Sequence, residues 1–261
     1  MIAAGAPFDD RGLLLGDGLF ETLLAKDGAL VLIGDHVLRM QAGARALGLP
    51  EPDGAELTAA AKASLGSAGL RSGRAAVRLT WTAGPGGRGL DRPAEMQPRL
   101  VASASASPQT TAPLRLALAT TRRNEASATS RWKTLSYLDN VLARREAHAA
   151  GADEAVMLNT AGRLACAAAG NLFWIDSGRL FTPALACGAL AGVMRSQVIA
   201  AAPGAGLELV EVAAAVDALE KAEGVFVTNS LMGVRAATGL GRGRSPHPAI
   251  AALAQGVSDV S

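Results

Sequence analysis

The sequence predicts a chain of two domains, each of the mixed α/β or α+β class. Its 261 residues are enough for one large domain or two smaller ones with separate cores. Hydrophobic residues make up 49% and charged residues 18%, which indicates a folded chain rather than a disordered one. Strand-like and helix-like stretches alternate, and one small, polar, proline-bearing segment separates them into two groups.

The first group predicts a hairpin followed by two helices and two further strands. The turn Lys26-Asp27-Gly28 joins the first two strands. Asp35 is the expected N-cap of a helix that Gly48 ends, and Asp53 has Glu56 at the spacing of a capping box. We expect strands at 19–25, 29–33, 75–82 and 99–104, and helices from 35 to 47 and from 53 to 65.

The segment 105–113 is the best linker candidate, and it predicts domains at 1–107 and 108–261. The second domain is expected to mix strands with helices of good helix formers, the longest of which ends at Gly151. Its expected strands are 114–121, 155–159, 171–175, 179–182 and 224–229, and its expected helices are 138–150, 194–202 and 216–222.

Composition argues against several function classes. The net charge is +2 and the basic residues are scattered, so we expect no nucleic-acid partner. No apolar run is long enough for a membrane helix and no signal peptide is recognisable, so we expect a cytoplasmic protein. Two cysteines and three distant histidines form no metal-binding pattern, and we expect no metal.

Lysine is rare in this chain, which draws attention to each one. The four are Lys26, Lys62, Lys133 and Lys221. Three have ordinary surface settings: a turn, the polar face of a helix, and a position between two glutamates. Lys133 follows Trp132 and has no acidic residue within five positions. An apolar pocket favours the neutral amine, so Lys133 is a candidate for Schiff-base chemistry, with a plain surface lysine as the alternative.

Five segments, in order and spacing, resemble the fold-type IV pyridoxal-phosphate enzymes, also called class IV aminotransferases. This family includes D-amino-acid and branched-chain aminotransferases and aminodeoxychorismate lyase. The run from Lys133 to Leu135 after Trp132, and the run from Asn171 to Trp174, look most like the lyase. Each motif alone is short, but the set reaches from about residue 10 to about residue 240. The segments are 10–22, 36–40, 133–143, 162–174 and 190–195.

The resemblance implies a fold like that of D-amino-acid aminotransferase, with pyridoxal 5'-phosphate (PLP) in a cleft between the domains. Lys133 would carry the cofactor and move the proton at the substrate α-carbon. The phosphate would meet the guanidinium of Arg39 and backbone N–H groups at a helix N-terminus, both of which favour anions. The residues expected to bind the cofactor are Arg39, Cys166, Leu190 (against the pyridine ring), Val193, Met194, Ser230 and Leu231.

Arg88 is the expected substrate-binding residue. It lies in the most glycine-rich loop of the chain, which would let a guanidinium approach an anionic substrate. A solvated arginine on a surface loop is the alternative.

Cys166 departs from the family pattern. The family has a glutamate there, five residues before the Asn-Leu-Phe motif, which bonds the pyridine nitrogen and keeps it protonated. A thiol is a weak hydrogen-bond partner with an ordinary pKa near 8.5. Three interpretations stay open: chemistry with a largely neutral pyridine, a distant acid that replaces the glutamate in space, or cofactor binding with little turnover.

The predicted function is a PLP-dependent lyase that resembles 4-amino-4-deoxychorismate lyase, which releases pyruvate and gives 4-aminobenzoate for folate biosynthesis. The first alternative is a class IV aminotransferase acting on a D- or branched-chain amino acid or an amine. The second is a PLP-binding protein with little turnover. The resemblance also implies a small-molecule amino substrate and a homodimer.

Overall fold

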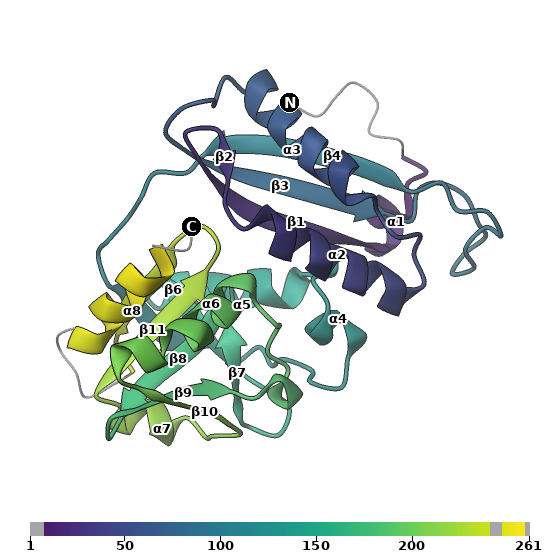
Figure 1. Cartoon of the computed structure of the whole chain (residues 1–261). Helices are drawn as coiled ribbons and strands as arrows, with labels where there is room; N and C mark the ends of the chain where they lie inside the picture. The colour runs from purple at the N-terminus through teal and green to yellow at the C-terminus, as the bar shows by residue number, and fades with distance from the viewer. Residues whose placement is uncertain (1–7, 241–246, 259–261) are drawn as a thin grey trace. The chain divides into compact units, whose positions relative to one another are not determined.

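A computed structural model describes residues 8–240 and 247–258. The described chain divides into two compact units (Figure 1). The first contains the residues up to Pro108 together with Trp132–Ser136. The second contains Gln109–Arg131 and the residues from Tyr137 onward. The segment around Lys133 thus returns to the first unit, a feature that the predicted division at 107 and 108 did not include.

The first unit is an antiparallel four-stranded sheet with two long helices. The sheet order is β2-β1-β3-β4. The register pairs Leu19 with Trp81 and Leu23 with Val77, so these four side chains lie on one face. Its elements are α1 (Arg11–Leu15), β1 (Gly18–Lys26), β2 (Ala29–Leu30), α2 (Ile33–Leu47), α3 (Gly54–Ser67), β3 (Arg74–Thr82) and β4 (Arg99–Ala106).

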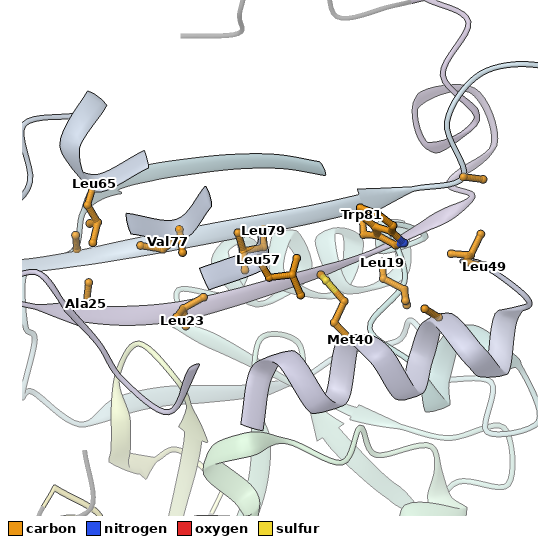
Figure 2. Close-up of a cluster of buried hydrophobic side chains, with 14 residues drawn as sticks. Leu19, Leu23, Ala25, Met40, Leu49, Leu57, Leu65, Val77, Leu79 and Trp81 are labelled. Atoms are coloured by element: carbon orange, nitrogen blue, oxygen red, sulfur yellow. The ribbon is translucent and has the colours of Figure 1, made fainter. Parts of the chain in front are cut away.

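The core of the first unit lies between that sheet face and the helices α2 and α3. Figure 2 shows Met40 of α2 and Leu57 of α3 beside Leu19, Leu23 and Leu79 of the strands. The cluster is made almost entirely of leucine, valine and alanine. This packing holds β1 and α2 in a fixed relation, and both carry residues of the candidate site.

Local capping confirms one helix start and corrects the other. Asp53 accepts hydrogen bonds from the N–H groups of Ala55 and Glu56, as predicted. The prediction that Asp35 caps α2 is wrong, because α2 begins at Ile33 after Leu32, which takes a left-handed φ of 53°. The expected strand 29–33 is therefore cut to Ala29–Leu30. β4 runs on to Ala106, so the start of the expected linker belongs to the sheet.

The second unit is built on an eight-stranded mixed sheet of order β10-β9-β8-β11-β12-β5-β6-β7. Predicted strands 155–159, 171–175, 179–182 and 224–229 are confirmed to within a residue or two, while β7, β10 and β12 were not predicted. The strands are β5 (Leu114–Leu118), β6 (Glu154–Leu158), β7 (Leu164–Ala167), β8 (Asn171–Asp176), β9 (Arg179–Pro183), β10 (Glu208–Val212), β11 (Gly224–Asn229) and β12 (Gly233–Thr238).

Helices and short turns complete the second unit. The strands β6, β8 and β11 and the edge strand β7 are buried along nearly their whole length, which explains their nearly continuous apolar sequences. The helical elements are α4 (Ala128–Arg131), α5 (Leu138–Ala149), η1 (Leu185–Cys187), α6 (Val193–Ala201), η2 (Pro203–Ala205), α7 (Asp217–Lys221) and α8 (Pro248–Ser258). The mixed α/β class predicted from the sequence is confirmed.

Candidate active site

Lys133 lies in a short segment that adds to the edge of β1. The N–H of Phe20 donates to the carbonyl of Lys133 at 2.9 Å, and the N–H of Leu135 donates to the carbonyl of Gly18 at 3.0 Å. Thr134 stands opposite Leu19 in this antiparallel bridge. The backbone around Lys133 is therefore fixed to the first unit by two hydrogen bonds.

The side chain of Lys133 lies over an aromatic ring. Its Nζ is 4.2 Å from the centroid of Phe20, and Cζ of Arg78 is 3.9 Å from the same centroid. Cations are attracted to the negative face of an aromatic ring. The register pairs Thr22 with Arg78, which places Arg78 on the sheet face that carries Phe20. Sequence reasoning missed Arg78, since only the strand register brings it to this ring.

Arg39 is held by a buried carboxylate. Nε and Nη2 of Arg39 donate to the two oxygens of Glu21 at 2.8 and 2.5 Å. Nδ1 of His36 lies 2.7 Å from Oε2 of the same carboxylate. Glu21 therefore occupies the Nε edge of the guanidinium.

Two opposing effects act on the Glu21 carboxyl. Burial alone raises its pKa, because a charge is poorly solvated inside the protein. Arg39 and His36 outweigh burial and lower the pKa of Glu21 from 4.5 to about 2. Glu21 is therefore ionised at neutral pH and balances the charge of Arg39.

Arg88 is exposed and lies in a loop whose backbone is hydrogen-bonded to the side chain of Arg11. The buried side chain of Arg11 donates to the carbonyls of Leu90 and Asp91 at 2.9 and 3.0 Å. Arg11 also donates to Asp17 at 2.9 Å. The loop backbone is thus fixed while the side chain of Arg88 faces outward, and its role in substrate binding stays a prediction.

In the second unit, Asn171 positions the start of α6. Its Nδ2 donates to the carbonyl of Leu190 at 2.8 Å. A Cβ on Gly192 would come within 2.0 Å of Oδ1 of Asn171, so a larger residue there would force the Asn171 side chain to move. Gly192 makes no side-chain cap, and the first turn of α6, with Val193 and Met194, begins without one.

Arg195 is the third residue of α6 and is buried. Its Nη2 donates to Glu211 at 2.7 Å. Its Nε is buried and has no hydrogen-bond partner among the described residues. A buried guanidinium N–H that lacks a partner is costly, and an anion at this turn would reduce that cost.

Ser230 and Leu231 belong to a tight turn between β11 and β12. The N–H groups of Leu231 and Met232 donate to Oδ1 of Asn229 at 3.0 and 2.9 Å. An anion at Leu231 would have to share this N–H with Asn229. The side chain of Asn229 therefore orders this turn, which the sequence pattern did not indicate.

Cys166 is buried on β7, where Met157 of β6 is its partner. Burial raises the pKa of the thiol to about 11; Arg123 opposes this effect and Glu154 adds to it. The thiol is therefore neutral at neutral pH. Glu154 is the carboxylate whose charge reaches it, and Glu154 accepts from Arg144 at 3.0 Å and from the N–H of Ala155 at 3.0 Å.

Comparison with known proteins identifies the family. Residues 18–240 match the model of "Amino-transferase class IV". The chain belongs to this family. A provisionally named branched-chain-amino-acid aminotransferase of Methanocaldococcus jannaschii is 32% identical over 85% of this chain and 77% of its own length.

Two further class IV relatives are named as lyases. Aminodeoxychorismate lyase of Vibrio harveyi is 29% identical over 90% of this chain and 87% of its own length. The crystal structure of 4-amino-4-deoxychorismate lyase from Pseudomonas aeruginosa is 32% identical, with a TM-score of 0.87 and coverage of 98% of this chain and 96% of that one. The chain is therefore an enzyme with the class IV fold, and class IV enzymes use PLP.

The residues present fit PLP except at one position. The uncapped first turn of α6 and the unpartnered Nε of Arg195 suit a phosphate, and Lys133 supplies an amine. At Cys166, the position that the resemblance assigns to the pyridine nitrogen, a neutral thiol holds no charge to pair with a protonated pyridine. Among the described residues no group of histidines, cysteines and acids is suited to a metal ion, and no described helix is long and apolar enough to span a membrane.

Proposed function

We propose that this class IV enzyme is a lyase that converts 4-amino-4-deoxychorismate into 4-aminobenzoate and pyruvate. The observation that carries the proposal is the neutral, buried thiol of Cys166 in place of a carboxylate. Without that carboxylate, the cofactor ring takes up electrons less readily. In the lyase reaction, formation of an aromatic product supplies driving force, so the reaction depends less on electron withdrawal by the cofactor ring. The lyases of Vibrio harveyi and Pseudomonas aeruginosa support the same choice.

The reaction needs no second substrate. The bond between the ring carbon and the enolpyruvyl oxygen breaks, a ring proton is lost, and the enolpyruvyl group leaves as pyruvate. All atoms of the substrate appear in the two products.

When bound, PLP supplies a carbonyl that condenses with amines and a ring that withdraws electrons from the attached carbon. The amine of Lys133 would hold the cofactor and then accept and return protons. Arg39, which Glu21 holds in place, would meet the phosphate. The N–H groups of Val193 and Met194 would meet the same phosphate.

The other predicted contacts are proposed on the same basis. Leu190, whose carbonyl holds Asn171, would pack against the pyridine ring. Ser230 and the shared N–H of Leu231 would complete the phosphate site. Arg88 would bind a substrate carboxylate from the loop that Arg11 ties down.

Transamination is the second candidate function. The archaeal relative named as a branched-chain aminotransferase favours it, as its identity and coverage are similar to those of the lyases. An aminotransferase would need a 2-oxo acid to complete its cycle. Cofactor binding with little turnover is the third reading, and it rests on Cys166.

One assay separates these functions. The PLP-loaded protein is incubated with 4-amino-4-deoxychorismate without any 2-oxo acid, and pyruvate and 4-aminobenzoate are measured. The proposal expects both products in equal amounts, and none from Lys133→Ala. Amine transfer that depends on a 2-oxo acid, without pyruvate release from this substrate, would show an aminotransferase. A visible cofactor band with neither activity would show a protein that binds PLP with little turnover.

We further propose a homodimer in the cytoplasm that serves folate biosynthesis through 4-aminobenzoate. Support for a dimer comes from exposed apolar side chains on the first unit, with Leu13, Leu14 and Leu90 at 63%, 63% and 84% exposure. Both cysteines are unpaired, which suits a reducing compartment. Light scattering after size-exclusion chromatography should give twice the chain mass; a monomer would contradict the dimer.

A further inference from the structure

The segment that carries Lys133 leaves the second unit and returns to it within a few residues. Trp132–Ser136 packs with the first unit, whereas the residues on both sides of it belong to the second. We call Trp132–Ser136 the crossover. Its middle is hydrogen-bonded to β1 through the backbone of Lys133 and Leu135. What fixes its two ends decides how much freedom the amine has.

A single buried side chain ties both ends. Nη2 of Arg123 donates to the carbonyls of Thr129 and Ser130 at 3.3 and 3.2 Å, just before the crossover. Nη1 of Arg123 donates to Oδ1 of Asn140 at 3.0 Å, just after it. Arg123 is only 5% exposed, so water does not compete strongly for these bonds.

The tie continues into the body of the second unit. Nδ2 of Asn140 donates to the carbonyl of Ala168 at 2.8 Å, next to the end of β7. Nε of Arg123 donates to the carbonyl of Gly188 at 3.3 Å. A Cβ at Gly188, where φ is +93°, would lie 3.1 Å from Cγ of Arg123, so the backbone there passes close to the arginine.

We propose that Arg123 is a positioning residue for Lys133: its planar fork clamps both ends of the crossover and so restricts the position of the amine. The inference rests on the proposed role of Lys133. A guanidinium suits this task because it offers five donors in a rigid plane, whereas an ammonium is a single point. A misplacement of about 1 Å at a reacting group can cost about 100-fold in rate, which gives such a clamp its value.

The test compares Arg123→Lys and Asn140→Ala with the control Thr182→Val. Arg123→Lys keeps the charge, but one ammonium cannot reach both ends of the crossover. Asn140→Ala releases only the later end. Thr182→Val removes a buried hydrogen bond of similar length, 2.9 Å to the carbonyl of Leu172, elsewhere in the same unit.

The first readout needs no cofactor. Each apoprotein is treated with a limiting amine-modifying reagent, and modification of Lys133 is measured by mass spectrometry relative to Lys62. The chain has only four lysines, so each can be followed separately. Asn140→Ala removes the charge-assisted hydrogen bond from Arg123 together with the bond to Ala168, and it should raise the relative modification of Lys133 about 10- to 100-fold; Arg123→Lys should raise it further. Thr182→Val should leave the ratio unchanged.

Hydrogen exchange of the amides in 129–140 gives a second readout, and faster exchange is expected in both clamp variants. The third is the pH titration of the visible cofactor band, which should move in Arg123→Lys and not in Thr182→Val. If the clamp variants lose stability like Thr182→Val with no change at Lys133, Arg123 is merely structural and the inference is wrong. If the wild type shows no cofactor band, but Lys133 modification and hydrogen exchange still increase in the Arg123 and Asn140 variants, the proposed function is wrong while the positioning role of Arg123 is supported.

Discussion

The substitution Glu21→Gln removes one charge from a buried cluster and leaves the size of the side chain almost unchanged. The two oxygens of Glu21 accept from Arg39 at 2.8 and 2.5 Å, and one of them lies 2.7 Å from Nδ1 of His36. An amide offers one oxygen and one NH2 group. The NH2 group would face a donor, so at least one buried hydrogen bond to Arg39 or His36 is lost and the charge of Arg39 is left unbalanced.

The magnitude follows from the pKa of Glu21. Folding lowers the pKa of the Glu21 carboxyl from 4.5 to about 2, and this difference corresponds to about 3 kcal/mol of folding free energy. A carboxyl with a depressed folded-state pKa stabilises the protein fully above its unfolded pKa. That contribution is lost as pH falls from about 4.5 toward about 2. Glu21→Gln should therefore be less stable than the wild type by about 3 kcal/mol at pH 7, and this gap should narrow below about pH 5.

Urea unfolding of the apoproteins at a series of pH values from 7 to 3 measures the gap directly, and it does not depend on any cofactor. The control is Asp153→Asn. The pKa of Asp153 is also lowered to about 2, chiefly by Arg115, but this pair is exposed and screened by water. Asp153→Asn should therefore lower the free energy of unfolding much less than Glu21→Gln does. A gap for Glu21→Gln that is the same at every pH, or no larger than that of Asp153→Asn, would refute the reasoning.

Four further predictions concern the candidate site. Lys133→Ala should lose the visible cofactor band, and borohydride reduction of the wild type should fix the cofactor on the peptide that contains Lys133; labelling of another lysine contradicts the assignment. Arg39→Ala should weaken PLP binding about 10- to 100-fold but affect pyridoxal, which has no phosphate, far less; equal losses would place the phosphate elsewhere. Cys166→Glu should raise the rate of any transamination half-reaction more than that of the lyase reaction, and an unchanged spectrum with lower stability would show that Cys166 is only a core residue. Thr134→Val should raise the free energy of unfolding by about 1 kcal/mol, because the buried Oγ1 of Thr134 has no partner among the described residues; a lower melting temperature would show that this hydroxyl has one.

Elements set by local sequence were predicted well. Asp53 caps α3 and Gly48, with φ of +66°, ends α2, because capping depends on a few neighbouring residues. The start of α2 was missed because Leu32 adopts a left-handed conformation that residues other than glycine, asparagine and aspartate rarely take, and no local signal marks it. β12 was missed because its sequence, with Arg235 and several small residues, gains its place through pairing with β11 and β5 rather than through propensity.

The candidate site divides in the same way. Lys133 could be singled out from the sequence because lysine is rare and no acidic residue lies within five positions of this one. Arg78 and Arg123 could not, because their partners are far away in the sequence: Arg78 meets Phe20 through strand register, and Arg123 reaches Asn140 and Gly188 through tertiary packing. Both are ordinary arginines in sequence terms, and the chain has many of them.

The missing carboxylate at Cys166 shows what the structure adds to this sequence. A replacement acid was one open interpretation, and Glu154 is the carboxylate whose charge reaches the thiol. Its oxygens already accept from Arg144 and from the backbone of Ala155, and the N–H groups of Ala168 and Ala169 also favour its charged form. A carboxylate bound on so many sides is held in place by the fold, and turning it toward a ligand would leave several backbone N–H groups without this partner and break its pair with the exposed Arg144. Burial opposes these contacts and raises the pKa of Glu154. Glu154 is therefore held by the fold, and the thiol of Cys166 is neutral. On the proposed assignment of Cys166 to the pyridine nitrogen, a neutral thiol favours a reaction driven by its product over one that relies on a charged ring.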